Sequence, residues 1–207
     1  APLSQKLSAI AKDPSFAAKS YTDMGGKPER QVSMFITHWD VCLSSDSMFK
    51  VTKERGLSVH FAIDNDGTIY QLLDTKDIAW HAKGVNGASV GVEISNAFYP
   101  KYQSWYEKRD FGSRPLITDA HVHGKKLEDH LGFYPIQLQA LQALMRAVNK
   151  CTGIPLQTPL DRSGKTNTKV SKKAADGRFE GFISHYHLTT RKIDCAGLDI
   201  KKLLEEL

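Results

Sequence analysis

Short apolar segments of strand length, separated by polar turns and by stretches with helical spacing, most constrain the fold of this chain. Segments of four to eight residues that are rich in Val, Ile and Phe are typical of strands buried in a sheet. Residues 64–67 end in Asp-Gly, which favours a hairpin turn because this pair tolerates the positive φ of tight turns. The expected strands, including the return strand of that hairpin, are residues 32–36, 59–63, 68–73, 89–94 and 182–185.

Helices are expected between these strands and after them. The clearest runs from about Ile136 to Asn149, because its apolar residues recur on one stripe and Pro135 suits the first turn of a helix. The other expected helices are residues 5–12, 47–55 and 198–207. Strands and helices mixed in this order predict an α/β fold with a central mixed β-sheet flanked by helices.

The 207 residues suit a single domain. We expect its core to comprise residues 31–96 and 180–207, with the helix near residues 136–149 between them. Two long polar insertions are expected at about residues 97–133 and 155–179. The first carries a cluster of aromatic residues, which either lines a substrate groove or packs onto the body of the domain.

Composition narrows the class of protein. With 41% hydrophobic and 25% charged residues the chain is an ordinary globular one, and no apolar run approaches the about 18 residues of a membrane span. The first residues lack the apolar segment of a signal peptide, so export would need a signal already removed or another route. Three cysteines are too few for a disulfide scaffold. The net charge of +5 suits an anionic partner, such as nucleic acid, a membrane surface or bacterial cell wall.

Two histidines stand at the ends of expected strands, His38 after residues 34–37 and His185 after residues 182–184. Cys195 follows ten positions after His185, on an expected loop. Three nitrogen, sulfur or oxygen ligands that leave a fourth position for water are typical of catalytic zinc. Spacing alone does not single out this triple, because a chain with eight histidines offers many.

Two further polar features stand out in this framework. Glu93 interrupts the apolar residues 89–94, and burying its carboxylate costs several kcal/mol unless it is paired. A general base with a raised pKa would need such a place, whereas a salt bridge or an edge position facing solvent would account for it equally well. His121 and His123 resemble the His-x-His of metal hydrolases, but they lie in an insertion without strand context.

Five motifs appear in a fixed order, which is more specific than any one of them. They are Phe35-Ile36-Thr37-His38, residues 60–71, Ala79-Trp80-His81-Ala82-Lys83-Gly84, Ser89-Val90-Gly91-Val92-Glu93-Ile94, and the segment from His185 to Gly197. In this order they resemble the zinc-dependent N-acetylmuramoyl-L-alanine amidase type 2 family, whose members include T7 lysozyme, the AmpD-type amidases and the peptidoglycan recognition proteins. The resemblance covers residues 31–96 and 180–207.

The resemblance implies a zinc site made of His38, His185 and Cys195. The third ligand in this family is a Cys or Asp that directly precedes Pro-Gly. Here Ala196-Gly197 follows Cys195, and if this pair stands in place of Pro-Gly, the third ligand is Cys195. Asp194 is the alternative, since the family lysine usually lies two residues before the ligand and Lys192 lies two before Asp194.

The resemblance also implies the catalytic and substrate-binding residues. Glu93 would be the base that takes a proton from the attacking water, and Lys192 would stabilise the oxyanion. His81 and Asn96 would lie near the substrate. His187 is the alternative to the second histidine ligand, because it lies eight positions before Cys195.

These residues together imply zinc-dependent hydrolysis of the amide between N-acetylmuramic acid and L-alanine in peptidoglycan. We expect a monomer that acts on the bacterial cell wall, in the periplasm or outside the cell, without nucleic acid. A basic single domain favours a phage endolysin over a recycling enzyme or a secreted effector. The alternatives are a recognition module that binds peptidoglycan without turnover and a thiol hydrolase that uses Cys195 as its nucleophile.

Overall fold

The computed structural model describes residues 18–20 and 30–207, so the helix expected at residues 5–12 lies outside the described residues. A five-stranded sheet with the order β11-β2-β6-β3-β4 forms the centre of the domain, as the mixed sheet expected from the sequence. Its first four strands run parallel, and β4 pairs antiparallel with β3. The strands are β2 (Met34–Trp39), β3 (Phe61–Ile63), β4 (Ile69–Gln71), β6 (Ser89–Ile94) and β11 (Gly181–Ser184).

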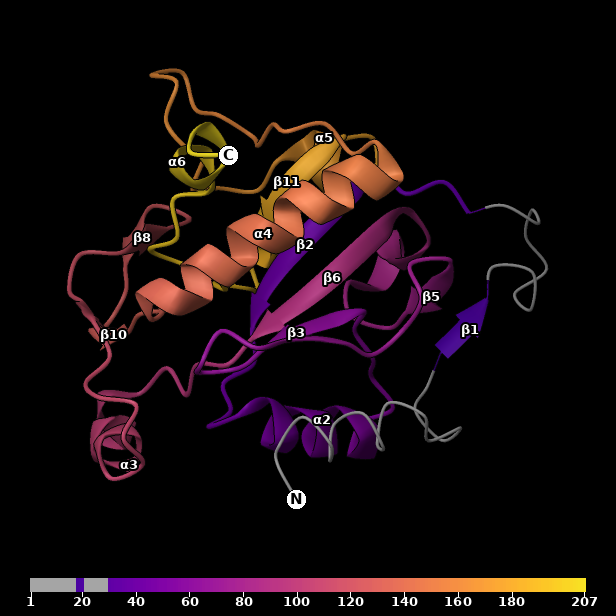
Figure 1. The fold of residues 1–207 in the computed structure, drawn as a ribbon. Coiled ribbons are helices and arrows are strands. Elements are labelled where there is room, and N and C mark those ends of the chain that lie inside the picture. Colours follow the sequence, from indigo (N-terminus) through magenta and orange to yellow (C-terminus); the bar gives the residue numbers. More distant parts are fainter. Residues whose placement is uncertain (1–17, 21–29) are drawn as a thin grey trace.

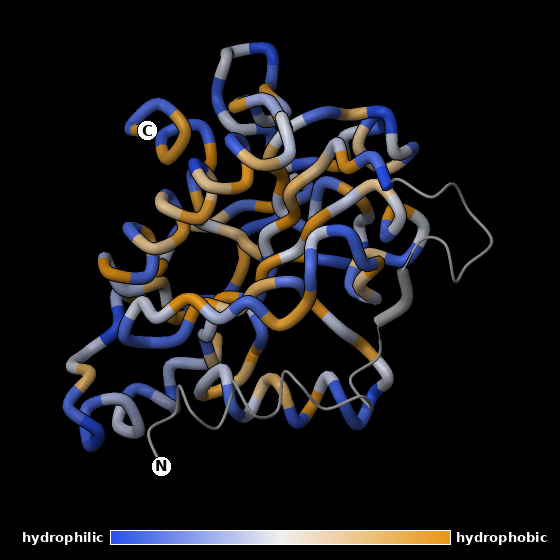
Figure 2. Tube along the Cα trace, turned by 45° about the vertical axis from the view of Figure 1, so that its right-hand side comes forward, coloured by the Kyte–Doolittle hydropathy of each residue, from blue (hydrophilic) through white to orange (hydrophobic). Residues whose placement is uncertain are grey.

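Helices pack against this sheet from two sides (Figure 1). α4 (Pro135–Thr152) lies across one face, where Leu141 shares a buried cluster with Phe35 of β2. α2 (Ser45–Glu54) packs on the other side through Met48. Hydrophobic residues alternate with hydrophilic ones along the chain (Figure 2). Burying one such side chain contributes about 1.5–3 kcal/mol, so these apolar stripes hold the layers together. None of the helices in the described ranges is both long and apolar enough to cross a membrane.

The elements expected from the sequence differ from those of the structure mainly at their ends. α4 extends to Thr152 because Gly153, with φ +75°, provides the left-handed residue that ends the helix. The last helix, α6 (Ile200–Glu205), begins later than expected because the side chain of Asp199 caps it, accepting a hydrogen bond from the main-chain N–H of Lys202.

Short elements fill the two long polar segments. Residues 97–133 contain α3 (Gln103–Glu107) and two small antiparallel pairs, β7 (Leu116–Ile117) with β10 (His130–Leu131) and β8 (His121–Val122) with β9 (Lys125–Lys126). The aromatic residues of this segment pack mainly onto the body of the domain, with Tyr106 fully buried against Tyr134. The remaining elements are β1 (Ala18–Ser20), β5 (Asp77–Ala79), η1 (Lys83–Ala88), η2 (Pro100–Tyr102), α5 (Lys172–Ala175) and η3 (His185–His187).

Arg114 joins the segment 97–133 to the body of the domain. Arg114 is 2% exposed, and its guanidinium carbon lies 4.3 Å from the ring centre of Tyr106 and 4.3 Å from that of Tyr134. Its hydrogen-bond acceptors are the main-chain carbonyls of Gly132 and Ser95 and the side-chain oxygens of Gln137 and Asn65. One buried side chain therefore ties this segment to the ends of β3 and β6 and to the first turn of α4.

We expect Arg114→Met to lower the free energy of unfolding by about 3 kcal/mol or more, because it removes four buried hydrogen bonds and leaves the acceptors on Gly132 and Asn65 without a donor, while those on Ser95 and Gln137 keep one other. Arg109→Met is the matched control, since that guanidinium lies 4.1 Å from the ring centre of Trp105 at the surface. Its loss should cost less than about 1 kcal/mol. Urea unfolding of the two variants measures both effects, and equal losses would contradict the role of Arg114.

Candidate active site

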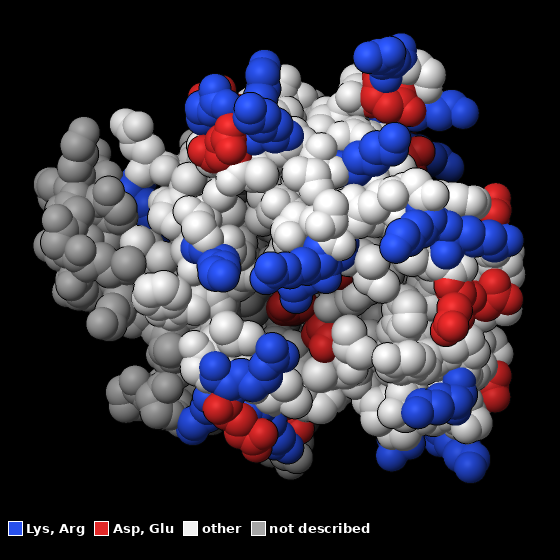
Figure 3. Space-filling model, turned by 180° about the vertical axis from the view of Figure 1, so that it is seen from behind, with Lys and Arg blue, Asp and Glu red and all other residues white. Residues whose placement is uncertain are grey.

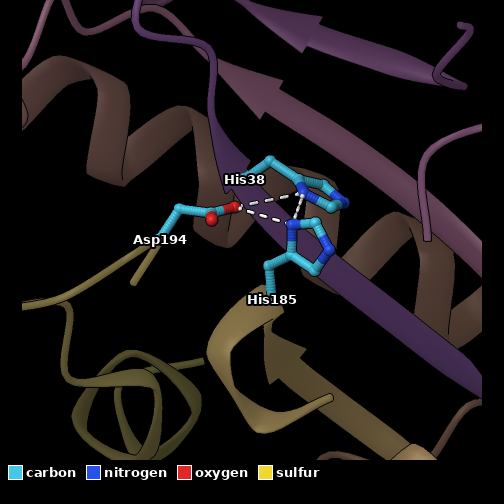
Figure 4. Close-up of side chains that lie close together, drawn as sticks. All are labelled: His38, His185 and Asp194. Atoms are coloured by element: carbon cyan, nitrogen blue, oxygen red, sulfur yellow. Dashed lines mark hydrogen bonds and ion pairs between the residues drawn. The ribbon is translucent and has the colours of Figure 1, made fainter. Parts of the chain in front are cut away.

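Two histidines and a carboxylate converge at one edge of the sheet (Figure 4). His38 lies on β2, and His185 follows directly after β11. Because β2 and β11 are parallel neighbours, their carboxyl ends meet at this edge. Asp194 enters from the loop before α6. The Nδ1 atom of His38 lies 2.9 Å from Nδ1 of His185 and 3.2 Å from Oδ2 of Asp194, and the third side of the triangle, from His185 Nδ1 to Asp194 Oδ2, is 3.0 Å.

A chain of hydrogen bonds sets the proton on His38. The hydroxyl of Ser89 donates to the carbonyl of Val85 (2.9 Å), so it accepts from Nε2–H of His81 (3.2 Å). Nδ1 of His81 is then an acceptor, and it receives the Nε2–H of His38 at 3.0 Å. Nδ1 of His38 therefore carries a free lone pair that points into the cluster. Such outer partners orient the ligands of metal sites and fix their tautomer.

The donor set fits a zinc ion. Burial, followed by the neighbouring His185, lowers the pKa of His38 to about 4, so this ring is neutral at neutral pH. Burial alone raises the pKa of Asp194, but its contacts with the two histidines outweigh burial and hold that pKa below its usual range. A single proton on His185 can serve at most two of the three close contacts. Two donor atoms bound to one tetrahedral zinc ion lie about 3.3 Å apart. The donor atoms of this cluster lie 2.9 to 3.2 Å apart, which is close to that value.

The third member of the cluster is Asp194, the alternative that the sequence left open, and not Cys195. The carboxylate of Asp194 faces both histidines, and in the described part of the chain these three residues are the one group with metal-binding spacing. Cys195 is fully buried and belongs to the main apolar cluster, and burial raises the pKa of its thiol well above the usual value. A buried, protonated thiol is a poor nucleophile, which argues against the thiol-hydrolase alternative as well.

His185, and not His187, reaches the cluster. Nδ1 of His187 accepts the main-chain N–H of Ser184 at 3.0 Å, and its Nε2–H donates to the carbonyl of Asn167 at 2.6 Å. His187 is fully buried by these contacts. It therefore fastens the segment 155–179 to the end of β11.

Glu93 lies on the strand beside His38, and the two residues are register partners in β6 and β2. Its Oε2 atom is buried and has no hydrogen-bond partner among the described residues. Burial, followed by the charges of Asp40 and Asp194, raises the pKa of Glu93 well above its usual value. Among the described residues, Glu93 therefore has no salt bridge that would explain its position. An unpartnered carboxyl with a raised pKa beside a metal-type cluster is suited to proton transfer.

The cluster opens into a pocket of about 210 Å³ that Glu93 and Lys192 also line. A larger groove of about 680 Å³ adjoins it and shares His185 and Lys192 with it. The groove is lined by four cationic side chains, those of Arg55, Lys83, Arg191 and Lys192, and by no acidic one among the described residues. Seen from behind the view of Figure 1, the molecule has a hollow with acidic side chains at its floor and basic ones around it (Figure 3).

The two residues expected near the substrate have different surroundings. His81 lines both the pocket and the groove while it holds His38, so its position serves the metal cluster. Asn96 is fully buried and lines neither cavity. Its side-chain amide donates to the carbonyl of Leu131 at 2.7 Å and accepts the N–H of Phe98 at 2.8 Å. Asn96 therefore belongs to the scaffold between β6 and the segment 97–133.

Gly91 leaves room for the ring of His81. The sequence analysis did not predict this role of Gly91. A Cβ atom at this position would overlap Nδ1 of His81. We therefore expect Gly91→Ala to displace His81, break its bond to His38 and weaken zinc binding by about 10- to 100-fold. Gly84→Ala is the control, because its Cβ would meet nothing within 4 Å. Competition with a zinc-binding dye measures both variants, and equal affinities would contradict the role given to Gly91.

Comparisons with known proteins bear on the family and the fold of the chain. Residues 28–195 match the model of the N-acetylmuramoyl-L-alanine amidase family. No curated protein matches the chain significantly. Among solved structures, the fold resembles AmpDh3 from Pseudomonas aeruginosa, in complex with anhydromuramic pentapeptide, with a TM-score of 0.54 and 17% identity over 86% of this chain. The match spans 60% of the length of that chain.

A second similar structure is the hydrolase AmiA from Staphylococcus aureus in complex with its ligand. It has a TM-score of 0.56 and 13% identity, and the match covers 92% of this chain and 76% of that one. At this level of sequence identity the two structural matches show a shared fold, whereas the family model matches most of the sequence. The chain therefore belongs to the N-acetylmuramoyl-L-alanine amidase type 2 family.

Proposed function

We propose that the chain is a zinc-dependent amidase that hydrolyses the bond between the lactyl group of N-acetylmuramic acid and the L-alanine of the stem peptide. The observation that carries this proposal is the pocket in which Glu93 and Lys192 accompany the cluster of His38, His185 and Asp194. Membership of the amidase family supports the same reaction.

His38, His185 and Asp194 would hold the zinc ion. Zinc bound there would supply Lewis-acid chemistry, because it polarises a carbonyl group and lowers the pKa of water to about 7. Asp194 provides the negative charge of the donor set. The hydrogen bond from His38 to His81 keeps the free lone pair of His38 directed into the cluster.

Glu93 would transfer the proton in the reaction, and Lys192 would stabilise the negative charge that develops on the substrate. Glu93 takes a proton from the attacking water and delivers it to the nitrogen of the departing L-alanine. Its raised pKa makes the carboxylate a stronger base for this task. Lys192 donates to the oxygen that becomes negative as the tetrahedral intermediate forms.

The groove beside the pocket suits the remainder of the substrate. Peptidoglycan stem peptides carry free carboxylates, and the cations of Arg55, Lys83 and Arg191 line the groove without a competing acid among the described residues. Cleavage of such a substrate would place the chain at the cell wall, in the periplasm or outside the cell. The endolysin role remains a prediction.

Purified peptidoglycan incubated with the zinc-loaded protein tests the function. We expect new L-alanine amino termini to appear, to stop appearing when a chelator is added, and to return when zinc is restored. Binding of peptidoglycan without release would instead favour the recognition module. Release that survives the chelator would contradict the metal centre.

A further inference from the structure

The histidine pair at positions 121 and 123 has no place in the proposed reaction, and the structure does not use it as a metal site. In the described ranges, neither histidine belongs to a group with metal-binding spacing. His121 is exposed on β8, and its Nδ1 lies 3.1 Å from the carbonyl of Asp119. His123 occupies the turn between β8 and β9 with φ +55°, a left-handed conformation that is uncommon outside glycine.

This turn directs His123 toward the main chain of the loop that carries Lys192. Its Nε2–H donates to the main-chain carbonyl of Lys192 at 3.0 Å. Its own main-chain N–H donates to the carbonyl of Thr168 at 2.8 Å, and its ring lies edge-on to Tyr186 with the ring centres 6.3 Å apart. His123 therefore connects three segments that are distant in sequence: the hairpin, the segment 155–179 and the loop that carries Lys192.

The loop of residues 189–193 packs against the main apolar cluster through Ile193 but has few hydrogen bonds to the rest of the domain. Its internal hydrogen bonds are local, from the N–H groups of Arg191 and Lys192 to Thr189. Within the part of the chain that the structure describes, His123 is the one group outside residues 185–196 that hydrogen-bonds to this loop. The same loop leads directly into Asp194.

We propose that His123 is a positioning residue, which holds the main chain at Lys192 so that the lysine side chain stays over the metal pocket. This inference rests on the proposed function for the role of Lys192. It gives the β8–β9 hairpin of the segment 97–133 a task in the reaction. A reacting group displaced by about 1 Å can lose about 10²-fold in rate, so one hydrogen bond at this place has a measurable effect.

Asn and Gln at position 123 form a matched pair for the test. Asn tolerates the left-handed backbone but is too short to reach the carbonyl of Lys192, whereas the amide of Gln extends to the place of Nε2. We expect His123→Asn to lower kcat by about 10-fold or more with KM and zinc content little changed, and His123→Gln to restore most of the loss. His121→Asn on the same hairpin should leave kcat unchanged.

A double-mutant cycle with Lys192→Met tests whether His123 acts through the lysine. In the Lys192→Met protein, His123→Asn should reduce kcat no further. An equal loss in both backgrounds, or no loss in the single variant, would overturn the proposal.

Hydrogen exchange separates failure of this proposal from failure of the proposed function. Amide exchange of residues 189–193 should be faster in zinc-loaded His123→Asn than in wild type or His123→Gln, whether or not the protein cleaves peptidoglycan. Unchanged exchange would overturn the positioning role. Faster exchange in a protein without amidase activity would retain the structural contact and reject the catalytic one.

Discussion

Replacing Asp194 with alanine is expected to abolish amidase activity and to weaken zinc binding by more than about 100-fold, beyond the usual cost of losing an outer partner of a metal site. The carboxylate is the one negative donor in the cluster, and both histidines lie within 3.2 Å of it. The measurement is zinc content after dialysis, together with the rate of release of L-alanine amino termini.

Cys195→Ala is the variant that separates the two adjacent candidates. Because the thiol is fully buried in the apolar core, its loss should lower the midpoint of thermal unfolding while zinc content and activity persist. A Cys195→Ala protein that folds but loses its zinc, beside an Asp194→Ala protein that keeps it, would reverse the assignment.

Glu93→Gln is expected to lower kcat by about 10²- to 10⁴-fold while zinc stays bound, because it removes the proton acceptor and keeps the shape of the side chain. The rate of the wild-type protein should fall as pH decreases through the raised pKa of Glu93, since only the ionised carboxylate accepts a proton. The variant should lack this limb of the pH profile. A variant with wild-type kcat would exclude Glu93 as the base.

The same variant should be more stable than wild type in the zinc-free protein at neutral pH. The pKa of Glu93 is higher in the folded chain than in the unfolded one, so the folded state binds more protons between those two values. Its contribution to stability is present below the unfolded pKa and is lost as pH rises through the folded pKa. Thermal unfolding at pH 4 and pH 7 measures this, with the gain from Glu93→Gln expected at pH 7 alone.

The apolar periodicity of the sequence was sufficient to predict the sheet and its main helices. β6 spans the residues expected for it, and the leucines of α4 face the core as their spacing predicts. The two-residue strands β7 to β10 were not predictable, because such short pairs have no periodic signal; β7 and β10 lie next to Arg114 and its acceptor Gly132, which no local pattern indicates. Their position follows from contacts between residues far apart in sequence.

The sequence placed both histidines at strand ends, but their choice among eight histidines came from the resemblance of the five ordered motifs. His38 and His185 end neighbouring parallel strands, and Glu93 is the register partner of His38. The choice between Asp194 and Cys195 was not predictable, because adjacent residues of a loop point in different directions according to a backbone path that spacing does not contain. Asn96 was expected near the substrate from the resemblance, yet its side chain is used within the scaffold.

Diffraction from crystals of the zinc-loaded protein, recorded on both sides of the zinc absorption edge, tests the metal centre most directly. The account predicts one anomalous peak among Nδ1 of His38, Nδ1 of His185 and the carboxylate of Asp194, at about 2.0–2.2 Å from each. A peak bonded to the sulfur of Cys195 or to His187, or no peak at this cluster, would contradict it.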